Sequence, residues 1–538
     1  MLHSIKSLWK LNVEKLSRRE LFRRWSLLTL PALLPGRLSA ALVQAQGLRV
    51  GQDVYQSIGV RPLINARGTF TIISGSLMLP EVRAAMDTAA QHHVHLDELT
   101  EAIGARLAEL TKAEWGIVTS GCAAALTHAT AACVAGGNPD LHIRIPNLQG
   151  FPKDEVIIPK HSRNVYDAAV RAVGVRVIEV ETIDELESAL GPRSTMIYIL
   201  AGPQADRSPL NTRAVAQLAR PKGIPILVDA AAEVLTVPNV HLENGATLVG
   251  YSGGKCLRGP QSAGILLGRK DLVRAAWVHS APHHGFARSM KVGKEEAIGM
   301  LMAVEMWVKR DHQAEWNRWL SWLDHIAKRV SAIDGVTTSI EQPSGLSNRT
   351  PSLLIRWDRT RLGISGRAVA KNLFDTEPRI ATPGGRGGTS GTETGISITP
   401  YQMSPGEEKV VADRLYTLLS NPPKQETEQT RPPSVDLSGR WDVRIEYAAG
   451  SSNHVLHLRQ QGSRIEGTHQ GDFMSRDLSG NIEGDAVQMT STYTERHGDS
   501  LMFNFVGKVS GAEISGTLDM GEYLMAKWTA KKHEYRKD

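Results

Sequence analysis

Short apolar runs alternate with helical segments over residues 115–267, and this alternation constrains the fold more than any other feature of the chain. Runs of this kind are typical of parallel strands that are covered on both faces. The sequence therefore predicts an α/β fold, with a mostly parallel sheet between two layers of helices. The expected strands are residues 115–119, 155–159, 175–180, 195–200, 224–229, 246–251 and 264–267, and helices are expected from residue 161 and over 183–190 and 211–219.

Four polar residues follow the ends of these strands: Ser120, His161, Asp229 and Lys255. In sheets of this class, ligands bind beyond the carboxyl ends of the strands. We therefore expect one crevice to collect all four side chains.

Lys255 stands in a glycine turn, Ser252-Gly253-Gly254-Lys255, and Asp229 closes the preceding buried strand. This pair is what pyridoxal phosphate (PLP) chemistry needs. The lysine holds the cofactor as a Schiff base, and the aspartate keeps the pyridine nitrogen protonated, so that the ring accepts electrons. The alternatives are a solvated lysine in a turn and an aspartate that caps a helix.

Ser120 and Gly121 join an apolar strand to an alanine-rich helix that runs to about Ala135. The free N–H groups and the dipole at such a helix start can bind a phosphate. The dinucleotide fingerprint GxGxxG is absent. A Walker loop also fails at Lys255, because its first glycine would be Val249 and its last Ser/Thr would be Cys256.

The chain shows no metal site and no disulfide framework. His92, His93 and His95 are close together, but no further ligands accompany them, so we expect them to be structural or to line a substrate site. The three cysteines, with no CxxC spacing, are expected to be free thiols; they are Cys122, Cys133 and Cys256.

The first 45 residues are typical of a signal peptide. Arg18 and Arg19 precede a short apolar run at residues 25–34, and Val43-Gln44-Ala45 forms a small-residue cleavage site. The pattern resembles a twin-arginine (Tat) signal, which predicts export to the periplasm and no stable membrane span after cleavage. The alternative is a basic amphipathic leader helix.

The remaining sequence divides into a large α/β domain at residues 54–290, a long helix and small α+β lobe at 291–420, a linker at 421–434 and a β domain at 435–535. One helical region is expected over residues 294–330. A glycine-rich loop at residues 382–391 is expected beside the site. Net charge is +6 with several arginines in the signal, so nothing indicates a nucleic-acid surface.

The β domain is predicted from a period of two residues. Trp441, Val443 and Ile445 alternate with polar residues, and Ile-x-Gly recurs at residues 465–467, 482–484 and 514–516. Short alternating strands joined by turns predict an antiparallel barrel or sandwich. Gly439-Arg440-Trp441 resembles the entry motif of lipocalin-like barrels.

The lysine motif carries a family resemblance. The segments at residues 252–255 and 259–265 resemble that motif in bacterial selenocysteine synthase (L-seryl-tRNA selenium transferase) and, more closely, in D-glucosaminate-6-phosphate ammonia-lyase-like proteins. Residues 64–69, 75–78, 119–121 and 290–295 resemble the same group. The resemblance as a whole covers roughly residues 54–419.

The resemblance implies a fold-type I PLP-dependent transferase of the aspartate aminotransferase superfamily, with its active site at a homodimer interface. Lys255 would be the Schiff-base lysine and Asp229 the pyridinium partner. His161 would lie at the ring face or the substrate. Contacts to the phosphate would come from Ser120, Gly121, Cys122 and Ser252. Arg288 and Lys291 would be cationic groups near the phosphate or substrate, from the same or a neighbouring subunit. Gly254, Cys122 and the three histidines depart from the group's usual pattern, which puts the substrate in doubt more than the cofactor.

We therefore expect a PLP-dependent lyase or transferase that acts on an amino acid or amino-sugar acid. Lys255 would abstract the α-proton, and β-elimination or replacement would follow. The first alternative is selenium transfer onto seryl-tRNA, which the export signal opposes because charged tRNA is cytoplasmic. The second is a non-catalytic binding protein that retains the fold.

Overall fold

A computed structural model describes residues 47–385, 391–423, 431–494 and 500–534. The expected signal at residues 1–45 lies outside the described residues, as do parts of the expected loop at 382–391 and linker at 421–434. The chain divides after Pro62. Before that point, the described residues form one 3₁₀ turn, η1 (Gln56–Ile58).

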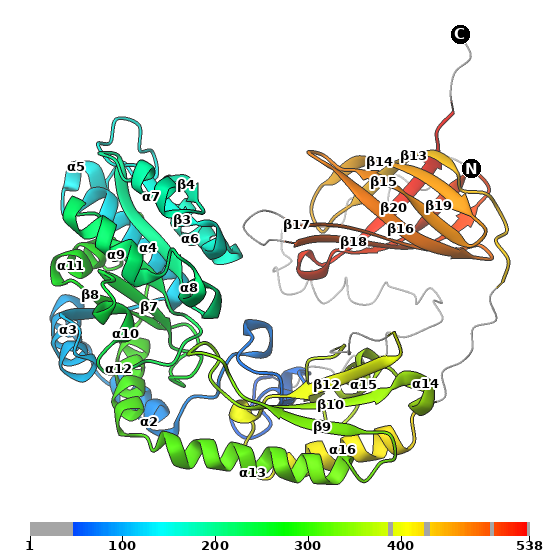
Figure 1. Cartoon of the computed structure of the whole chain (residues 1–538), viewed down its shortest axis with the longest axis horizontal. Coiled ribbons are helices and arrows are strands. Elements are labelled where there is room, and N and C mark those ends of the chain that lie inside the picture. The colour runs from blue at the N-terminus through cyan, green and yellow to red at the C-terminus, as the bar shows by residue number, and fades with distance from the viewer. Residues whose placement is uncertain (1–46, 386–390, 424–430, 495–499, 535–538) are drawn as a thin grey trace, which may run out of the picture. The chain divides into compact units, whose positions relative to one another are not determined.

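A seven-stranded sheet forms the first part of the second unit (Figure 1), in the order β2-β8-β7-β6-β5-β3-β4. Its strands are β2 (Trp115–Thr119), β3 (Glu155–Pro159), β4 (Arg176–Val180), β5 (Ser194–Leu200), β6 (Ile226–Asp229), β7 (Leu248–Ser252) and β8 (Gly264–Gly268). Only β8 runs against its neighbours. The α/β fold with a mostly parallel sheet is thus confirmed.

Consecutive strand residues enter separate cores on the two faces of this sheet. Val156 and Met196 belong to one core, whereas Ile157 and Ile197 belong to the other. The first core contains residues of α4 (Gly121–Ala135), α6 (Ala168–Arg171) and α11 (Lys270–Val278), and the second those of α3 (Leu96–Thr111), α9 (Thr212–Ala219) and α12 (Lys294–Lys309). This double coverage explains why the strand sequences are continuously apolar.

The helix expected to open at His161 is replaced by two 3₁₀ turns, η3 (Lys160–Ser162) and η4 (Val165–Asp167), before the short α6. Asn164 and Asp167 form a capping box that begins η4. Local side-chain bonds therefore start the helical structure later than the sequence indicated. The other short elements of this part are α2 (Pro80–Ala89), α5 (Pro139–His142), α7 (Ile183–Ala189), α8 (Pro203–Arg207), α10 (Val240–Glu243), η2 (Thr71–Ile73) and η5 (Arg220–Lys222).

The single helical region expected over residues 294–330 is two helices, α12 and α13 (His312–Val330). Arg310 adopts extended backbone angles, and the Asp311 side chain accepts a hydrogen bond from Ala314 N. An aspartate N-cap begins a new helix at this point. The periodic apolar pattern continues through the break and does not reveal it.

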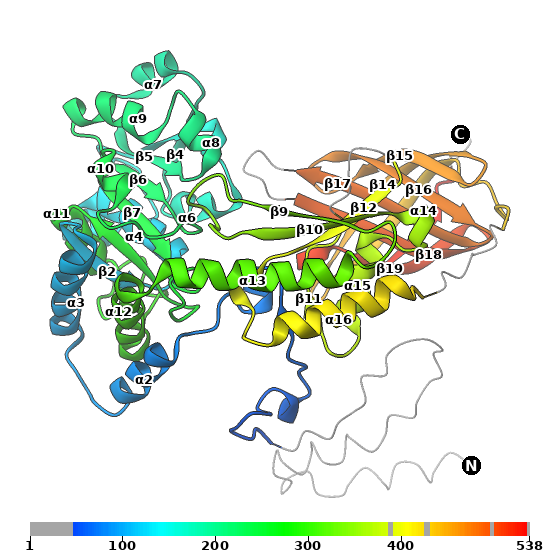
Figure 2. The same ribbon diagram turned by 60° about the horizontal axis from the view of Figure 1, so that its bottom comes forward.

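A smaller α+β lobe follows α13 (Figure 2). Its antiparallel sheet has the order β12-β10-β9, and its core includes side chains of the helices α13, α15 and α16. The elements of this lobe are β9 (Thr337–Glu341), β10 (Ser352–Asp358), β12 (Glu393–Ile398), α14 (Arg359–Leu362), α15 (Gly366–Asp375), α16 (Glu407–Ser420) and η6 (Pro400–Gln402). The chain before α2 joins the lobe, because β1 (Ile64–Asn65) pairs in parallel with β11 (Ile380–Ala381).

The C-terminal region is a closed, eight-stranded antiparallel barrel, the first of the two predicted alternatives. Trp441, Val443 and Ile445 face its interior, as their alternation indicated. The strands are β13 (Gly439–Glu446), β14 (Ser451–Gln461), β15 (Arg464–Gln470), β16 (Ser475–Glu483), β17 (Ala486–Thr494), β18 (Ser500–Ser510), β19 (Glu513–Asp519) and β20 (Met525–Lys532), with η7 (Gly521–Tyr523) before the last. Among the helices of the described residues, none is long and apolar enough to cross a bilayer.

Candidate functional site

The candidate residues gather at one edge of the large sheet. β2, β3, β6 and β7 all end there, because these strands run in the same direction. Gly264 of β8 pairs with both Thr119 and Ser252. The start of α4 and the lysine turn therefore lie on either side of one glycine.

Asp229, the last residue of β6, is almost fully buried, and its carboxylate is held from several sides. Tyr198 OH donates to Oδ2 at 2.9 Å, and Ala231 N donates to Oδ1 at 3.0 Å. Asn164 Nδ2 in turn donates to Tyr198 OH at 3.0 Å. Burial, and then the Asp229 charge, raise the Tyr198 pKa well above its ordinary value, so this hydroxyl keeps its proton.

Sequence reasoning missed Tyr198 and Asn164. Tyr198 lies within an apolar strand, and Asn164 within the segment assigned to a helix. Only the parallel pairing of β5 with β6 brings Tyr198 beside Asp229. The only signal in the sequence is that Tyr198 is the single residue with a polar group in the apolar run at residues 196–200.

Cys122 also reaches the carboxylate, with Sγ 3.5 Å from Asp229 Oδ1. Burial raises the pKa of this thiol well above its ordinary value, the Asp229 charge adds to that effect, and the Lys255 charge opposes it. A protonated thiol donates toward Asp229, so Cys122 contributes to the surroundings of the carboxylate as well as to the start of α4.

The start of α4 has open space on one side and closely packed backbone on the other. Ser120 is its N-cap residue but makes no side-chain capping bond. Gly121 has a φ of +78°, and nothing lies within 4 Å of where its Cβ would be. At Gly264, in contrast, a Cβ would lie 2.6 Å from Gly121 C and 2.8 Å from Cys122 N. The N–H groups at the start of α4 thus have open space on the side of Gly121 and closely packed backbone on the side of Gly264.

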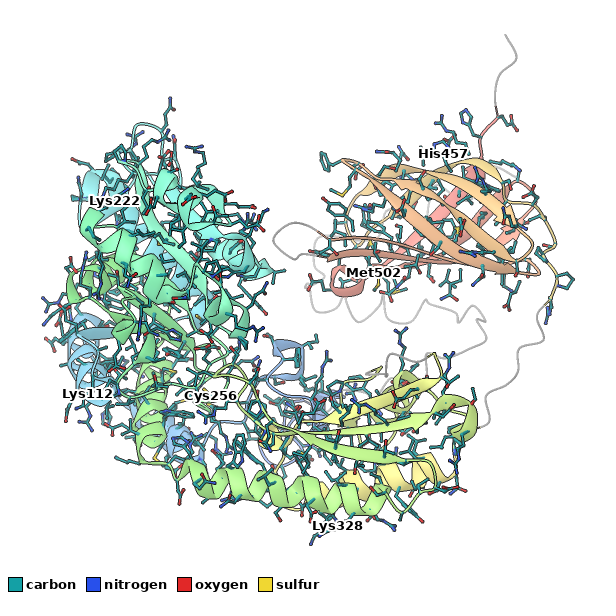
Figure 3. The ribbon with its side chains drawn as sticks, viewed as in Figure 1. Lys112, Lys222, Cys256, Lys328, His457 and Met502 are labelled. Carbon is teal, nitrogen blue, oxygen red and sulfur yellow. The ribbon has the colours of Figure 1, made fainter. Side chains whose placement is uncertain are left out.

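Lys255 lies in the turn after β7, half-buried, and lines a cavity of about 800 Å³. Its Nζ has no hydrogen-bond partner within the described ranges of the chain. Figure 3 labels Cys256, the next residue, whose Sγ donates to Glu233 O at 3.2 Å. The cavity is lined by Ala232, Val234, Leu235, Thr236, Val237, Lys255, Cys256, Arg258, Trp307, Val308, Arg310, His312, Gln313, Glu315, Trp316, Trp319, Asn348, Arg349 and Tyr401.

Of the residues predicted for the site, Lys255 alone lines this cavity. Asp229, Cys122 and Ser120 lie at the same sheet edge but are not among its walls. Sequence reasoning missed Arg258, Arg349 and the aromatic wall of Trp316 and Tyr401. These residues come from segments far apart in the chain, and no local motif marks them.

A preceding segment of the chain holds the lysine turn in place. Ser76 N donates to Gly254 O at 3.0 Å, and Arg258 Nε donates to Leu77 O at 3.1 Å. A Cβ on Gly75 would lie 2.8 Å from Gly254 O. The glycine-containing motif at residues 75–78 therefore packs directly against the turn that carries Lys255.

His161 follows β3 at the same sheet edge. Its Nδ1 lies 3.0 Å from Ser162 Oγ, which accepts a hydrogen bond from Leu200 N at the end of β5. Nε2 is buried and has no partner in the part of the chain that the structure describes. Burial lowers the pKa of this imidazole, which keeps the ring neutral near pH 7.

Arg288 and Lys291 of the described chain neither line the cavity nor contact Asp229. Both are exposed, and neither side chain pairs with another described residue. His92, His93 and His95 are exposed as well. Among the described residues, no group of three His, Cys, Asp or Glu side chains could hold a metal ion.

Two curated relatives match most of the chain. D-glucosaminate-6-phosphate ammonia lyase of Salmonella typhimurium is 30% identical over 379 residues, which are 69% of this chain and 98% of that enzyme. The 5'-C-glycyluridine monooxygenase-decarboxylase of a Streptomyces species is 31% identical over 378 residues, 68% of this chain and 92% of that protein. No protein-family model matches the chain.

A shorter match and one solved structure extend this comparison. L-seryl-tRNA(Sec) selenium transferase of Moorella thermoacetica is 28% identical over 277 residues, which are 44% of this chain and 53% of that protein. The solved structure of D-glucosaminate-6-phosphate ammonia-lyase superposes with a TM-score of 0.61 and 28% identity, over 68% of this chain and 98% of that one.

Proposed function

The chain belongs to the family of PLP-dependent lyases and transferases that includes D-glucosaminate-6-phosphate ammonia lyase, and from this premise we propose how its residues hold PLP and act on a substrate. The substrate is an amino acid or amino-sugar acid. The reaction is abstraction of its α-proton, followed by elimination or replacement of a β-substituent. The observation that carries the proposal is the buried Asp229 carboxylate at the sheet edge that also presents Lys255.

The residues at this edge fit the chemistry of PLP. Lys255 offers an amine without a partner among the described residues for the cofactor's aldehyde carbon. Asp229 offers a buried carboxylate for the ring nitrogen, and the start of α4, with Ser120, Gly121 and Cys122, offers N–H groups for the phosphate. Ser252 would add a hydroxyl there. The buried, unpartnered Nε2 of His161 would face the ring or the substrate.

When bound, PLP supplies a ring that stabilises negative charge on the substrate α-carbon. The chain's own residues supply the rest. Lys255 Nζ takes the proton from that carbon and returns it where the product requires it. Tyr198 and Ala231 N fix the Asp229 carboxylate, so the carboxylate cannot turn away during the reaction.

The cavity beside Lys255 favours an acidic substrate. Arg258 and Arg349 line it, and Glu315 is its one acidic wall residue among those described. The segment that carries Arg349 is tied to the chain after β6, because Asn348 N donates to Ala232 O at 2.8 Å. A substrate carboxylate would meet a guanidinium there, and the tryptophan side chains of the cavity would exclude water.

The first test is reductive trapping. Borohydride treatment of the PLP-loaded protein should fix the cofactor to Lys255, visible as a mass increase on the peptide that contains it. Lys255→Ala should fold and lose both the trapped mass and the near-visible absorption. Lys328→Ala, at a lysine whose side chain is 76% exposed on α13, is the matched control and should behave as wild type (Figure 3). A folded wild type without the absorption band would favour a non-catalytic binding protein.

The reaction is then assigned by its products. Release of ammonia and a keto acid from an amino acid or amino-sugar acid supports the lyase. Binding of seryl-tRNA would favour the selenium transferase alternative. Oxygen uptake with loss of carbon dioxide would instead favour a monooxygenase-decarboxylase reaction, the type given in the name of the Streptomyces relative.

We also propose export through the twin-arginine route, supported by residues 17–45 of the sequence. A PLP enzyme needs to fold around its cofactor before it leaves the cytoplasm, and this route carries folded proteins. Changing both Arg18 and Arg19 to Lys should retain the protein in the cytoplasm of a bacterial host. Periplasmic recovery of this double variant at the wild-type level would overturn the proposal.

A further inference from the structure

The interior of the β13–β20 barrel is apolar at one end and polar at the other. The apolar end holds Trp441, Ile465, Ile482 and Ile514, which are nearly or fully inaccessible. Trp441 Nε1 donates there to Leu437 O at 2.8 Å. The opposite end, where β13, β15 and β17 finish, is called the polar end here, and its buried polar side chains are His454, His469, Arg476 and Ser491.

The two histidines of the polar end belong to one hydrogen-bonded chain. Tyr447 OH lies 2.6 Å from Ser452 Oγ, and Ser452 Oγ lies 3.0 Å from His454 Nε2. His454 Nδ1 lies 2.7 Å from His469 Nε2, and His469 Nδ1 lies 2.7 Å from Ser491 Oγ. Every ring nitrogen thus has a partner. Burial lowers the pKa of His469 to about 3 and also lowers that of His454, so both rings are neutral near pH 7.

Arg476 differs from its neighbours because two of its nitrogen donors have no partner among the described residues. It occupies an inward position of β16 and is 9% exposed. Its guanidinium lies over the ring of Phe503 on β18, one strand beyond the neighbouring β17, with Cζ 4.6 Å from the ring centroid. Nε and Nη1 are buried and have no hydrogen-bond partner among the described residues. An unpaired, buried guanidinium is energetically costly, and the cost is relieved by an anion.

Among the described residues, no carboxylate pairs with this guanidinium. Burial lowers the pKa of Arg476 below its ordinary value, and the charges of Tyr447, Asp472 and Tyr493 oppose this effect in part. The Asp472 carboxylate is half exposed, lies 3.6 Å from His454 Nε2, and forms no ion pair with Arg476. Gly471 lies beside Nη1, and because it has no side chain, no Cβ fills the position 3.4 Å from that nitrogen.

We propose that the polar end of the barrel binds an oxyanion, a carboxylate or phosphate group, through the Arg476 guanidinium. The planar fork of an arginine pairs with either group through two parallel hydrogen bonds. The neutral histidine chain holds the wall beside it without adding charge. Phe503, which is partly exposed and packs against His469, offers an aromatic surface to the body of an organic ligand. This site is independent of the Lys255 chemistry.

Hydrogen exchange of the full-length protein, measured by mass spectrometry, tests the site where it lies. The probes are benzoate and inorganic phosphate, each at the same ionic strength as a sodium chloride reference. At least one probe should slow exchange several-fold in peptides that cover β15 and β16, and whichever acts identifies the group. Phosphate bound at the start of α4 would instead protect peptides near Gly121, which separates the two sites.

Two variants complete the test. Arg476→Met removes the charge and should abolish the protection, while exchange in the barrel without probe stays as slow as in wild type or becomes slower. Arg459→Met, at an exposed arginine of β14, should respond like wild type. Calorimetric titration with Arg476→Gln serves if the methionine variant does not fold. The proposal fails if neither probe protects β15 and β16, or if protection persists without the Arg476 charge.

Discussion

Asp229 is the residue on which the proposed chemistry depends most directly. Its carboxylate is buried and receives hydrogen bonds from Tyr198 and Ala231 N, with the Cys122 thiol at 3.5 Å. A charge held this firmly can act on a ligand without first reorganising. The neighbouring residues are therefore expected to affect turnover by holding this carboxylate. Substituting one of them should cost less activity than substituting Asp229 itself.

Asp229→Asn should leave the fold intact and lower turnover by roughly 100-fold, since a charged hydrogen bond contributes about 2–3 kcal/mol. Tyr198→Phe removes one bond to the carboxylate and should cost less, about 10-fold at most. The measurement is kcat with the best substrate, together with cofactor affinity by fluorescence. Equal losses in the two variants would contradict the role of the Asp229 charge.

Buried histidines on the α4 side of the sheet predict acid sensitivity. His128 and His279 are almost inaccessible, and His279 stacks on His142 with ring centroids 4.2 Å apart. Burial lowers the pKa of His128 to about 4 and that of His279 to about 3, from an ordinary 6.5. Below about pH 6.5, these histidines therefore bind protons in the unfolded chain but not in the folded chain. The contribution of these histidines to the free energy of unfolding is fully present above pH 6.5 and is lost as the pH drops from 6.5 toward 4.

Each such histidine steepens this decline by about 1.4 kcal/mol per pH unit. His279→Phe keeps an aromatic ring against His142 and removes one titrating group. Its free energy of unfolding, from urea titrations between pH 7 and pH 4.5, should fall less steeply than that of wild type by about that amount. His325→Phe, at a histidine of α13 outside this cluster, is the control. An unchanged slope for His279→Phe would show that its ring is protonated in the folded state.

At the scale of elements, the contact between β8 and the start of α4 positions the proposed phosphate site. A Cβ on Gly264 would collide with backbone atoms of Gly121, Tyr251 and Cys122, none of which is a flexible side-chain end. Of the two strands beside β8, β2 is followed directly by Ser120 and β7 ends at Ser252. The spacing of these elements thus depends on a residue without a side chain.

Gly264→Ala should destabilise the protein by about 1–3 kcal/mol, the usual cost of overpacking, and weaken PLP binding at least 10-fold. Gly191→Ala, where the nearest atom to a new Cβ is 3.9 Å away, should change neither quantity. Thermal unfolding and a PLP titration measure the two effects. PLP binding that stays at wild-type strength in Gly264→Ala would place the phosphate elsewhere.

At the scale of the whole molecule, Arg288 and Lys291 allow a test of whether two subunits share one active site. Both are exposed and unpaired among the described residues, which suits cationic groups that act in the site of a neighbouring subunit. Arg288→Ala with Lys291→Ala in one chain, and Lys255→Ala in another, should each be nearly inactive. Refolding an equal mixture should restore roughly a quarter of the wild-type sites, because half of random dimers carry one intact site.

Mixing that restores nothing, although native mass spectrometry detects mixed dimers, would place Arg288 and Lys291 outside the neighbouring site. The Lys328→Ala chain mixed with Lys255→Ala controls for dilution of active chains.

Sequence alone determined the class of fold and the motif residues, because both are local properties. Continuous apolar strands predict a sheet covered on both faces, period-two alternation predicts the barrel, and glycines around Lys255 mark a turn. The break between α12 and α13 escaped this reasoning, because one capping side chain, Asp311, decides it.

Only the tertiary structure decided what surrounds these residues. Tyr198 reaches Asp229 because two strands pair in parallel, and Arg349 reaches the cavity of Lys255 because backbone bonds dock a distant segment there. Arg476 has an ordinary sequence context, yet an inward position in a closed barrel leaves its charge buried. Such long-range contacts depend on chain topology, and no spacing along the sequence encodes them.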